Sequence, residues 1–405
     1  RQMCIRDRGN VPHLRFPEFS GEWEEHTLSE YLEFKNGLNP DAKRIGSGLP
    51  FISVMDILSE GVINYDNIRG KVNATEKEIE CFGVKDGDLL FQRSSETLED
   101  VGRANVYMDN RTAIYGGFVI RGRKIGNYDP LFFKYLLATP LARKRTCRMG
   151  AGAQHFNIGQ EGLSKISLYF PSIEEQRKIA EFLSLIDERI ATQNKIIEKL
   201  QSLIKGIVDE LMTVLLKGEL YPFASLYIKA GEGGTPTTSV SKYYSGGSIP
   251  FIKIDDLSQK YLTSNKDFIT ELGMQKSSAW LIPSQSVIYS NGATIGAISI
   301  NKYPVCTKQG ILGIVPNINV NVEYLYLLMS SSYFSKEVGR IITEGTMKTA
   351  YLKDINHIKS PLPSKAQQQN ITNLTSSIEK KLSMEQNCLK FLKLQKQHLL
   401  RTMFI

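Results

Sequence analysis

The feature that most constrains the fold is one segment that the chain contains twice. Residues 170–190 read FPSIEEQRKIAEFLSLIDERI, and residues 362–382 read LPSKAQQQNITNLTSSIEKKL. The second copy begins at an offset of 192 positions (362 − 170 = 192), and several Pro, Ser, Gln and Ile residues recur in step without a gap. Gln176 and Gln368 form one such pair. A repeat at about half the chain length predicts two copies of one larger structural unit.

Each copy opens a long helix. After Pro171 the apolar residues follow alternating steps of four and three positions, the heptad pattern of a helix that packs against a partner helix. Pro171 and Ser172 suit a helix start, and Lys217 with Gly218 suits a helix end. At about 1.5 Å per residue, the first helix is roughly 65 Å long. We expect the two helices to pair as an antiparallel coiled coil; the alternative is that each helix packs on its own globular domain.

Polar side chains interrupt this heptad seam. Gln193 and Glu385 occupy equivalent positions in the two copies, and both place a polar group in the apolar stripe. Such residues weaken a coiled coil but fix its register. The predicted seam consists of Leu183, Ile186, Ile190, Gln193, Ile197 and Leu200 in the first helix and of Ile378, Leu382, Glu385, Leu389 and Leu392 in the second.

The segments between the helices also match each other. LPFISVMDI (residues 49–57) corresponds to IPFIKIDDL (249–257), GDLLFQRSS (87–95) to QSVIYSNGA (285–293), and GGFVI (116–120) to QGILG (309–313). Short runs rich in β-forming residues, bounded by Gly, Asn and Asp and joined to one or two helices, predict an α+β domain. The expected order is therefore domain, helix, domain, helix, with similar frameworks and different loops.

Composition excludes several classes of protein. The hydrophobic share of 41% and the charged share of 23% are typical of folded globular chains. No apolar run approaches the roughly 18 residues of a membrane span, so we expect no membrane partner. The five cysteines form no CxxC pair, which favours a reducing cytoplasm over a disulfide framework or a zinc site. The net charge of +8 is compatible with a nucleic-acid partner but does not decide it.

Motifs of catalysis are missing from the sequence. It contains neither a GxxxxGK[ST] phosphate loop nor an HExxH metal site, and its five histidines are scattered. We therefore expect a binding protein without a cofactor, a metal or a catalytic residue of its own.

The order of several motifs resembles the specificity (S) subunit of type I restriction–modification systems, from about Leu14 to Ile405. PEFSGEWEEHTLSEY (17–31) and GGTPTTSVSKYYSGGSIPFI (233–252) are similar to the entries into the two target-recognition domains of this family. GDLLFQRSS resembles a Gly-Asp-aliphatic-aromatic-x-Arg stretch of the family. FPSIEEQRKIAEFLSLIDERI resembles its proline–EQ–helix segment, which is the most specific of these signals.

The resemblance implies a fold and a function. S subunits hold two α+β target-recognition domains apart with two long helices that pair as an antiparallel coiled coil. Each domain reads one half of a bipartite site in double-stranded DNA, and the helices set the spacer. The subunit itself is not an enzyme: two methyltransferase (modification) subunits methylate adenine with S-adenosylmethionine, and motor–nuclease (restriction) subunits cleave with ATP. The expected division is residues 1–16 as an N-terminal tail whose first eight residues are either non-native or a fragment end, 17–170 and 219–362 as recognition domains, and 171–218 and 363–405 as helices.

The loops after the strands and before the helices supply candidates for DNA binding. Arg93 follows an apolar run and opens a polar loop, from which a guanidinium could reach guanine or phosphate. Its counterpart is Asn291, where the family commonly has Arg; Asn could read adenine instead. The candidates are Arg93, Ser94, Arg103, Arg145, Gln154 and His155 in the first domain, and Asn291, Lys308, Gln309, Thr346 and Lys348 in the second.

Alternatives remain for these residues and for the chain. The Arg93 loop could be an ordinary exposed turn, and the basic run around Arg145 could be a solvated helix face. The chain as a whole could be a coiled-coil adaptor that binds only proteins, or a DNA enzyme whose motif is unfamiliar.

Overall fold

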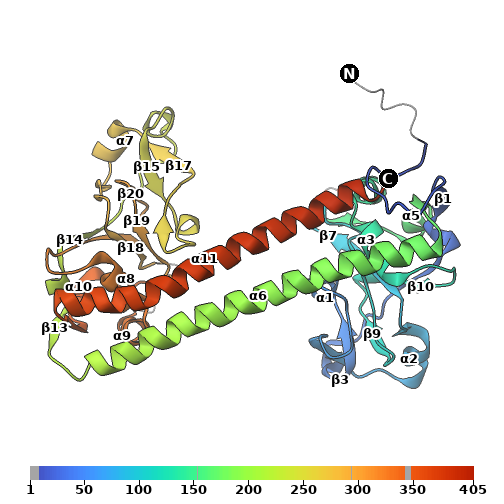
Figure 1. The fold of residues 1–405 in the computed structure, drawn as a ribbon, viewed down its shortest axis with the longest axis horizontal. Coiled ribbons are helices and arrows are strands. Elements are labelled where there is room, and N and C mark those ends of the chain that lie inside the picture. Colours follow the sequence, from blue (N-terminus) through green and yellow to red (C-terminus); the bar gives the residue numbers. More distant parts are fainter. Residues whose placement is uncertain (1–8, 153, 293, 343–347) are drawn as a thin grey trace. The chain divides into compact units, whose positions relative to one another are not determined.

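The computed structural model of the chain describes residues 9–152, 154–292, 294–342 and 348–405. These residues form two compact units (Figure 1). Unit 1 runs up to Asn194 and includes Asn387–Ile405, whereas unit 2 is Lys195–Gln386. Each unit therefore contains one mixed α/β region and a segment of each of the two long helices, α6 (Ile173–Leu215) and α11 (Lys365–Thr402).

Unit 1 is built on two four-stranded sheets. Their strand orders are β2-β10-β6-β8 and β4-β3-β9-β5, and two short pairs, β1-β12 and β11-β7, complete the unit. The strands are β1 (Glu24–Thr27), β2 (Leu32–Asn36), β3 (Ile45–Ile52), β4 (Gly70–Val72), β5 (Gly83–Val84), β6 (Leu89–Gln92), β7 (Ser94–Ser95), β8 (Ala104–Val106), β9 (Ala113–Tyr115), β10 (Val119–Lys124), β11 (Phe156–Asn157) and β12 (Ser167–Phe170). The helices are α1 (Val54–Ile57), α2 (Glu76–Phe82), α3 (Pro130–Leu137), α4 (Pro140–Arg148) and α5 (Gln160–Ser164).

Unit 2 has a related plan with different numbers of strands in its sheets. Its sheets have the orders β14-β21-β18-β19-β16, β17-β15-β20 and β13-β22. The strands are β13 (Leu220–Pro222), β14 (Tyr227–Glu232), β15 (Ile249–Ile252), β16 (Tyr261–Leu262), β17 (Asp267–Ile269), β18 (Val287–Ser290), β19 (Ile298–Asn301), β20 (Cys306–Thr307), β21 (Ile311–Pro316) and β22 (Lys359–Pro361). The helices are α7 (Glu271–Gln275), α8 (Val322–Ser330), α9 (Ser332–Ile341) and α10 (Leu352–Ile355). The α+β class predicted from the sequence is confirmed.

Strand registers show which of the predicted internal matches hold. The match of LPFISVMDI with IPFIKIDDL is confirmed, because Phe51 pairs in parallel with β9 as Phe251 pairs with β20. The match of GDLLFQRSS with QSVIYSNGA is confirmed by the antiparallel pairing of β6 with β10 and of β18 with β21. The match of GGFVI with QGILG is wrong by one residue. Val119 pairs with Gln92 as Ile311 pairs with Ser290, so Phe118 corresponds to Gly310. Two adjacent glycines in a turn carry no side-chain pattern, and the sequence therefore left this register undetermined.

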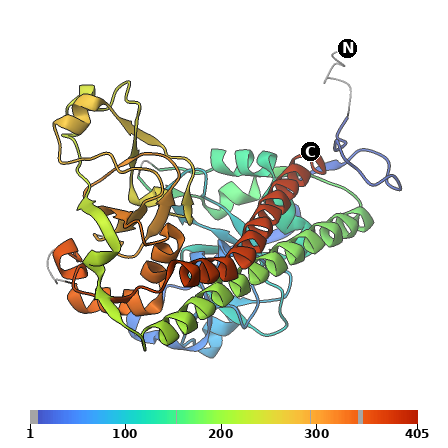
Figure 2. The same cartoon turned by 60° about the vertical axis from the view of Figure 1, so that its left-hand side comes forward.

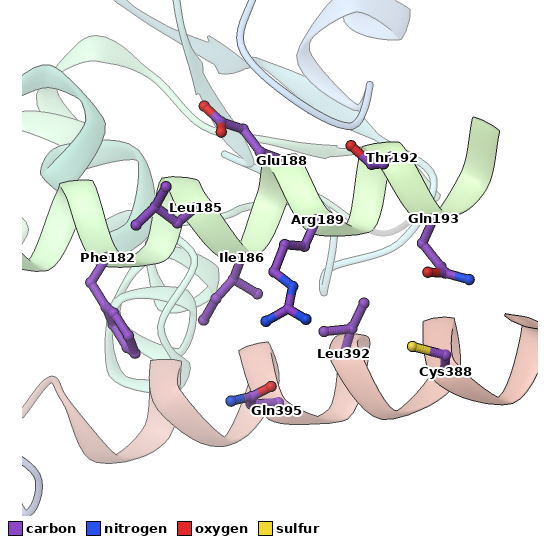
Figure 3. A pocket seen from close by; sticks show the side chains of 10 residues that line it. All are labelled: Phe182, Leu185, Ile186, Glu188, Arg189, Thr192, Gln193, Cys388, Leu392 and Gln395. Atoms are coloured by element: carbon purple, nitrogen blue, oxygen red, sulfur yellow. The ribbon is translucent and has the colours of Figure 1, made fainter. Parts of the chain in front are cut away.

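In unit 1 the first half of α6 packs antiparallel to the last part of α11 (Figures 2 and 3). The seam residues Leu183, Ile186 and Ile190 are buried in one cluster with Leu399 and Met403. The predicted seam residues Leu389 and Leu392 are partly buried against that cluster. Lys396, which interrupts the heptad pattern, forms an ion pair with Asp187 at 2.5 Å. A charge in the seam is thus matched by a charge on the facing helix.

In unit 2 the second half of α6 shares a core with the start of α11. Val208 and Met212 are buried in one cluster with Ile371. Thr375, another interruption of the pattern, is also buried, and its hydroxyl donates to the carbonyl of Thr372. Of the other predicted seam positions, Gln193 and Ile197 are buried, whereas Leu200, Ile378, Leu382 and Glu385 are partly buried.

Part of the predicted N-terminal tail packs on unit 1. Leu14 donates its backbone N–H to the carbonyl of Thr402 at 2.7 Å, and Arg15 forms two hydrogen bonds with Glu175 at 2.8 and 2.7 Å. Residues 9–16 are therefore structured, and residues 1–8 lie outside the described part of the chain.

Candidate nucleic-acid interface

The structure joins two predicted loops that lie about 60 residues apart in unit 1. β7, which directly follows Arg93, pairs antiparallel with β11, so that Ser94 faces Asn157. Ile158 donates its backbone N–H to the carbonyl of Arg93 at 3.0 Å. Gln154 and His155 lie just before β11, and both are exposed. The four candidates therefore belong to two chain segments that lie side by side.

Arg93 is held at its backbone while its side chain stays partly exposed. Its N–H donates to the carbonyl of Phe118 at 2.9 Å, and its Nη1 donates to the carbonyl of Gly117 at 3.4 Å. The Ser94 hydroxyl donates to the side-chain oxygen of Asn157. No carboxylate pairs with the Arg93 guanidinium among the ion pairs of the described residues. A guanidinium with spare donors beside exposed amide and imidazole groups is suited to phosphate oxygens or guanine.

Two other basic candidates have partners within the protein. Arg145, on α4, forms an ion pair with Glu25 at 2.7 Å and also donates to the Ser167 hydroxyl at 2.9 Å. The hydrogen bond from Ser167 and then that from Arg145 lower the pKa of Glu25. Arg103 pairs with Asp100 at 2.7 Å, although about half of its side chain is exposed. These pairs make Arg145 in particular a weaker candidate for DNA contact than Arg93.

Unit 2 repeats the backbone geometry of the Arg93 loop. Ala350 donates its N–H to the carbonyl of Asn291 at 2.9 Å, and Asn291 donates its own N–H to the carbonyl of Gly310 at 3.0 Å. The Asn291 side chain is 1% exposed, and its Nδ2 donates to the carbonyl of Ala350 at 3.1 Å. Asn291 thus supports the loop from within and does not present its amide at the surface.

The remaining unit 2 candidates lie near this loop at exposed positions. Lys308 and Gln309 precede Gly310, and both are exposed. Lys308 donates its backbone N–H to the carbonyl of Ile252 at 3.0 Å. Lys348 is exposed two residues before Ala350, whereas Thr346 lies outside the described residues.

A second surface lies between the long helices of unit 1. A groove of about 560 Å³ is lined by both α6 and α11, with Ile186, Arg189 and Leu392 among its walls (Figure 3). Leu185 and Phe391 are exposed on these helices, at 53% and 69%. Leu185 also lines the groove, whereas Phe391 is not among the lining residues.

Metal and membrane sites are not seen in the described residues. No group of three or more His, Cys, Asp or Glu side chains there is placed to hold a metal ion. None of the helices in the same part of the chain combines the length and the apolar character of a membrane span.

Comparison with protein families shows to which family the chain belongs. The model of the type I restriction modification DNA specificity domain matches residues 20–202 and 228–393, which is most of the chain. The chain belongs to this family. The type I restriction enzyme MjaVIII specificity subunit of Methanocaldococcus jannaschii is 22% identical over 391 residues, covering 90% of this chain and 87% of that relative.

Two solved structures have the same fold as this specificity-family chain. The S subunit of a type I restriction–modification system from M. genitalium matches with a TM-score of 0.55 at 16% identity, covering 98% of this chain and 99% of that one. A chain from a study of complex assembly and conformational transition in a type I system matches with a TM-score of 0.56 at 13% identity, covering 94% and 98%. At such identities the likeness supports the fold alone.

The first specificity domain also contains a feature that the sequence did not reveal. Phe118 and Met55 are large apolar side chains with 68% and 73% of their surface exposed. Both line one hollow of unit 1. The available signal was a phenylalanine directly after two glycines, a place where a turn brings a side chain to the surface.

Proposed function

We propose that this chain reads a bipartite sequence in double-stranded DNA, with one half recognised by each specificity domain. One observation carries the proposal. The same pair of backbone hydrogen bonds holds the loop of Arg93 in unit 1 and the loop of Asn291 in unit 2, while the side chains on the two loops differ. A repeated scaffold with different surface residues suits two half-sites of different sequence.

The long helices have two roles in this proposal. α6 is one continuous helix of 43 residues that begins in unit 1 and ends in unit 2, which supports a role in setting the spacer between half-sites. The groove of unit 1 and the exposed Leu185 and Phe391 support docking of methyltransferase subunits on the same helices. Two such subunits and the motor–nuclease subunits would supply methylation and cleavage.

The chain itself would bind without catalysis, in the cytoplasm where the DNA of such systems lies. The family match supports a recognition subunit. S-adenosylmethionine and ATP would then be used by the partner subunits.

A gel-shift series with the full chain tests the proposal. We expect retention of duplex DNA whose affinity falls steeply with salt, because loop arginines and lysines displace counterions from phosphates. Incubation with labelled S-adenosylmethionine and DNA, but without partner subunits, should give no methyl transfer. Absence of duplex binding at low salt would contradict DNA reading and favour the protein-only adaptor, which the exposed helix groove would also suit.

A further inference from the structure

An apolar hollow lies beside the Arg93 loop in unit 1. Its volume is about 400 Å³, and its floor is formed by the buried residues Leu38, Ile52 and Val119. Three large apolar side chains stand at its rim with most of their surface exposed: Ile45 at 54%, Met55 at 73% and Phe118 at 68%. Clusters of this kind on a folded domain mark interaction sites, since single exposed apolar residues are normal but convergent ones are not.

The hollow adjoins groups that favour nucleic acid. Arg93 is hydrogen-bonded through its backbone to Phe118 and through its guanidinium to Gly117, both of which line the hollow. Lys43 is exposed two positions before Ile45. An occupant of the hollow would therefore present an apolar group next to anionic or hydrogen-bond-accepting groups.

Unit 2 shares part of this floor but has a different rim. Ile252 and Ile311 take the places of Ile52 and Val119, as the strand registers show, whereas Gly234 takes the place of Leu38. At the rim, two exposed apolar residues of unit 1 are replaced by a charged and a small one: Met55 corresponds to Asp255, and Phe118 corresponds to Gly310. The buried Gly116 corresponds to the exposed Lys308. The equivalent surfaces of the two domains thus differ in chemistry while their frameworks agree.

One turn shows how unit 2 accommodates a side chain at a position where unit 1 has glycine. A Cβ atom at Gly117 would lie 1.8 Å from Oδ1 of Asn39. In unit 2 the corresponding Gln309 faces Thr235, whose hydroxyl accepts the Gln309 backbone N–H at 3.4 Å. A smaller neighbour therefore allows a side chain where unit 1 requires glycine.

We propose that Phe118 and Met55 contact the 5-methyl group of thymine in the half-site read by unit 1. The thymine methyl is the one apolar group that base pairs present in the major groove. Contact between the apolar rim and this methyl group removes apolar surface of both from water. Contact of the rim with phosphates or with amide and carbonyl edges of the bases brings no such stabilisation. The charged rim of unit 2, with Lys308 and Asp255, contacts polar groups instead. This inference rests on the proposed function. It adds that an apolar contact distinguishes the half-site read by unit 1 from the half-site read by unit 2.

The test uses the full chain and a library of randomised duplexes. Duplexes retained by the chain are sequenced, and the selected duplex is then made with each thymine replaced in turn by deoxyuridine, which lacks only the methyl group. We expect at least one replacement, confined to one half-site, to weaken binding about fourfold, because burial of one such carbon contributes about 0.8 kcal/mol.

Two substitutions assign that effect to the hollow. Phe118→Ala should bind the thymine and deoxyuridine duplexes equally, and it should fold normally because most of the side chain is exposed. Lys308→Ala in unit 2 is the matched control, which should keep the fourfold methyl effect while it weakens binding to the thymine and deoxyuridine duplexes alike and lowers the salt dependence. Thermal unfolding of both variants checks that the fold is kept.

The outcomes separate this inference from the proposed function. A selected bipartite duplex whose binding is indifferent to every methyl, or a Phe118→Ala variant that stays sensitive to it, overturns the thymine contact and leaves DNA reading intact. The thymine contact is likewise overturned if Phe118→Ala changes only self-association measured by light scattering, which would make the hollow a protein interface. Failure to retain any duplex overturns both.

Discussion

The side-chain oxygen of Gln176, on the long helix α6, accepts a hydrogen bond from the backbone N–H of Asp129 at 3.1 Å. Asp129 is the N-cap of α3, and its carboxylate accepts from Phe132 at 2.8 Å. The Gln176 amide also donates to the carbonyl of Pro171 at 3.0 Å. One buried glutamine therefore ties the start of the long helix to a capped helix of the recognition domain.

Gln368 makes the same contacts in unit 2. Its oxygen accepts from the N–H of Asn321, the N-cap of α8, at 2.7 Å, and its amide donates to Pro363 at 2.8 Å. These shared hydrogen bonds explain why a glutamine recurs at this position of the duplicated segment. A buried polar group in this position needs both of its partners.

Replacing either glutamine should destabilise its own unit. We expect Gln176→Ala to cost about 1–3 kcal/mol, because the partly buried N–H of Asp129 and the buried carbonyl of Pro171 both lose a partner. Gln201→Ala, at an exposed position of α6, is the control and should change stability little. Thermal unfolding followed by calorimetry measures the difference, and equal midpoints for the two variants would contradict the role assigned to Gln176.

Arg93→Ala should weaken recognition of one half-site only. A bidentate contact to guanine contributes about 1–3 kcal/mol of discrimination, so sequence preference should relax by about fivefold or more at one position. Arg177→Ala, an exposed arginine on α6, removes the same charge and should leave preference unchanged. Selection from randomised duplexes gives the readout; loss at both halves, or at neither, would remove Arg93 from base reading.

Shortening both long helices by one heptad should shorten the spacer of the DNA site. Seven residues at about 1.5 Å each correspond to about 10 Å, or close to three base pairs at about 3.4 Å. Mapping of methylated adenines produced by the assembled complex would measure the spacer. An unchanged spacer would show that the helices do not set it.

Gln285 marks a strained turn in unit 2 that unit 1 builds with glycine. It has a φ of 62°, in the left-handed region, and it corresponds to Gly87 with a φ of 81°. A residue other than glycine pays about 1–2 kcal/mol in that region, so Gln285→Gly should stabilise unit 2, by about 1 kcal/mol at most.

The matched variant lies in unit 1. Gly87→Ala should destabilise by more than about 1 kcal/mol, since its Cβ would also meet Pro130 at 3.2 Å. We expect the thermal midpoint to rise for Gln285→Gly and to fall for Gly87→Ala. A lower midpoint for Gln285→Gly would show that the exposed glutamine contributes something that glycine cannot.

Lys134 should make stability depend on pH. Burial lowers the pKa of Lys134 to about 8, against an ordinary value of 10.5. Because the folded-state pKa is the lower one, the folded chain binds fewer protons than the unfolded chain between these values, and the cost of the buried charge falls as pH rises through this window. Lys134→Met should therefore be stabilising at pH 7, and its advantage should shrink toward pH 10.5.

The comparison variant for this prediction is Lys144→Met, at an exposed position of α4. Its difference from the native chain should stay flat over the same pH range. Urea unfolding at several pH values measures both differences. An advantage of Lys134→Met that grows with pH would have the wrong sign and would contradict the lowered pKa.

The sequence alone determined the repeat, the long helices and the α+β class. These features depend on periodicity and local signals: a heptad stripe with Leu183 and Ile186 has to be buried along one face of a helix, and a matched pair such as Gln176 and Gln368 is visible in one dimension. Strand-forming runs bounded by turn residues likewise fix element type without knowledge of the neighbours.

Only the tertiary structure decided which side chains remain at the surface. Arg93 and Asn291 occupy equivalent backbone positions, yet Arg93 is partly exposed while Asn291 is buried against Ala350. The apolar rim at Phe118 and the ion pair that occupies Arg145 also depend on segments distant in sequence. Burial and pairing of a loop side chain are set by whatever strand or turn folds over it, and a linear pattern does not contain that information.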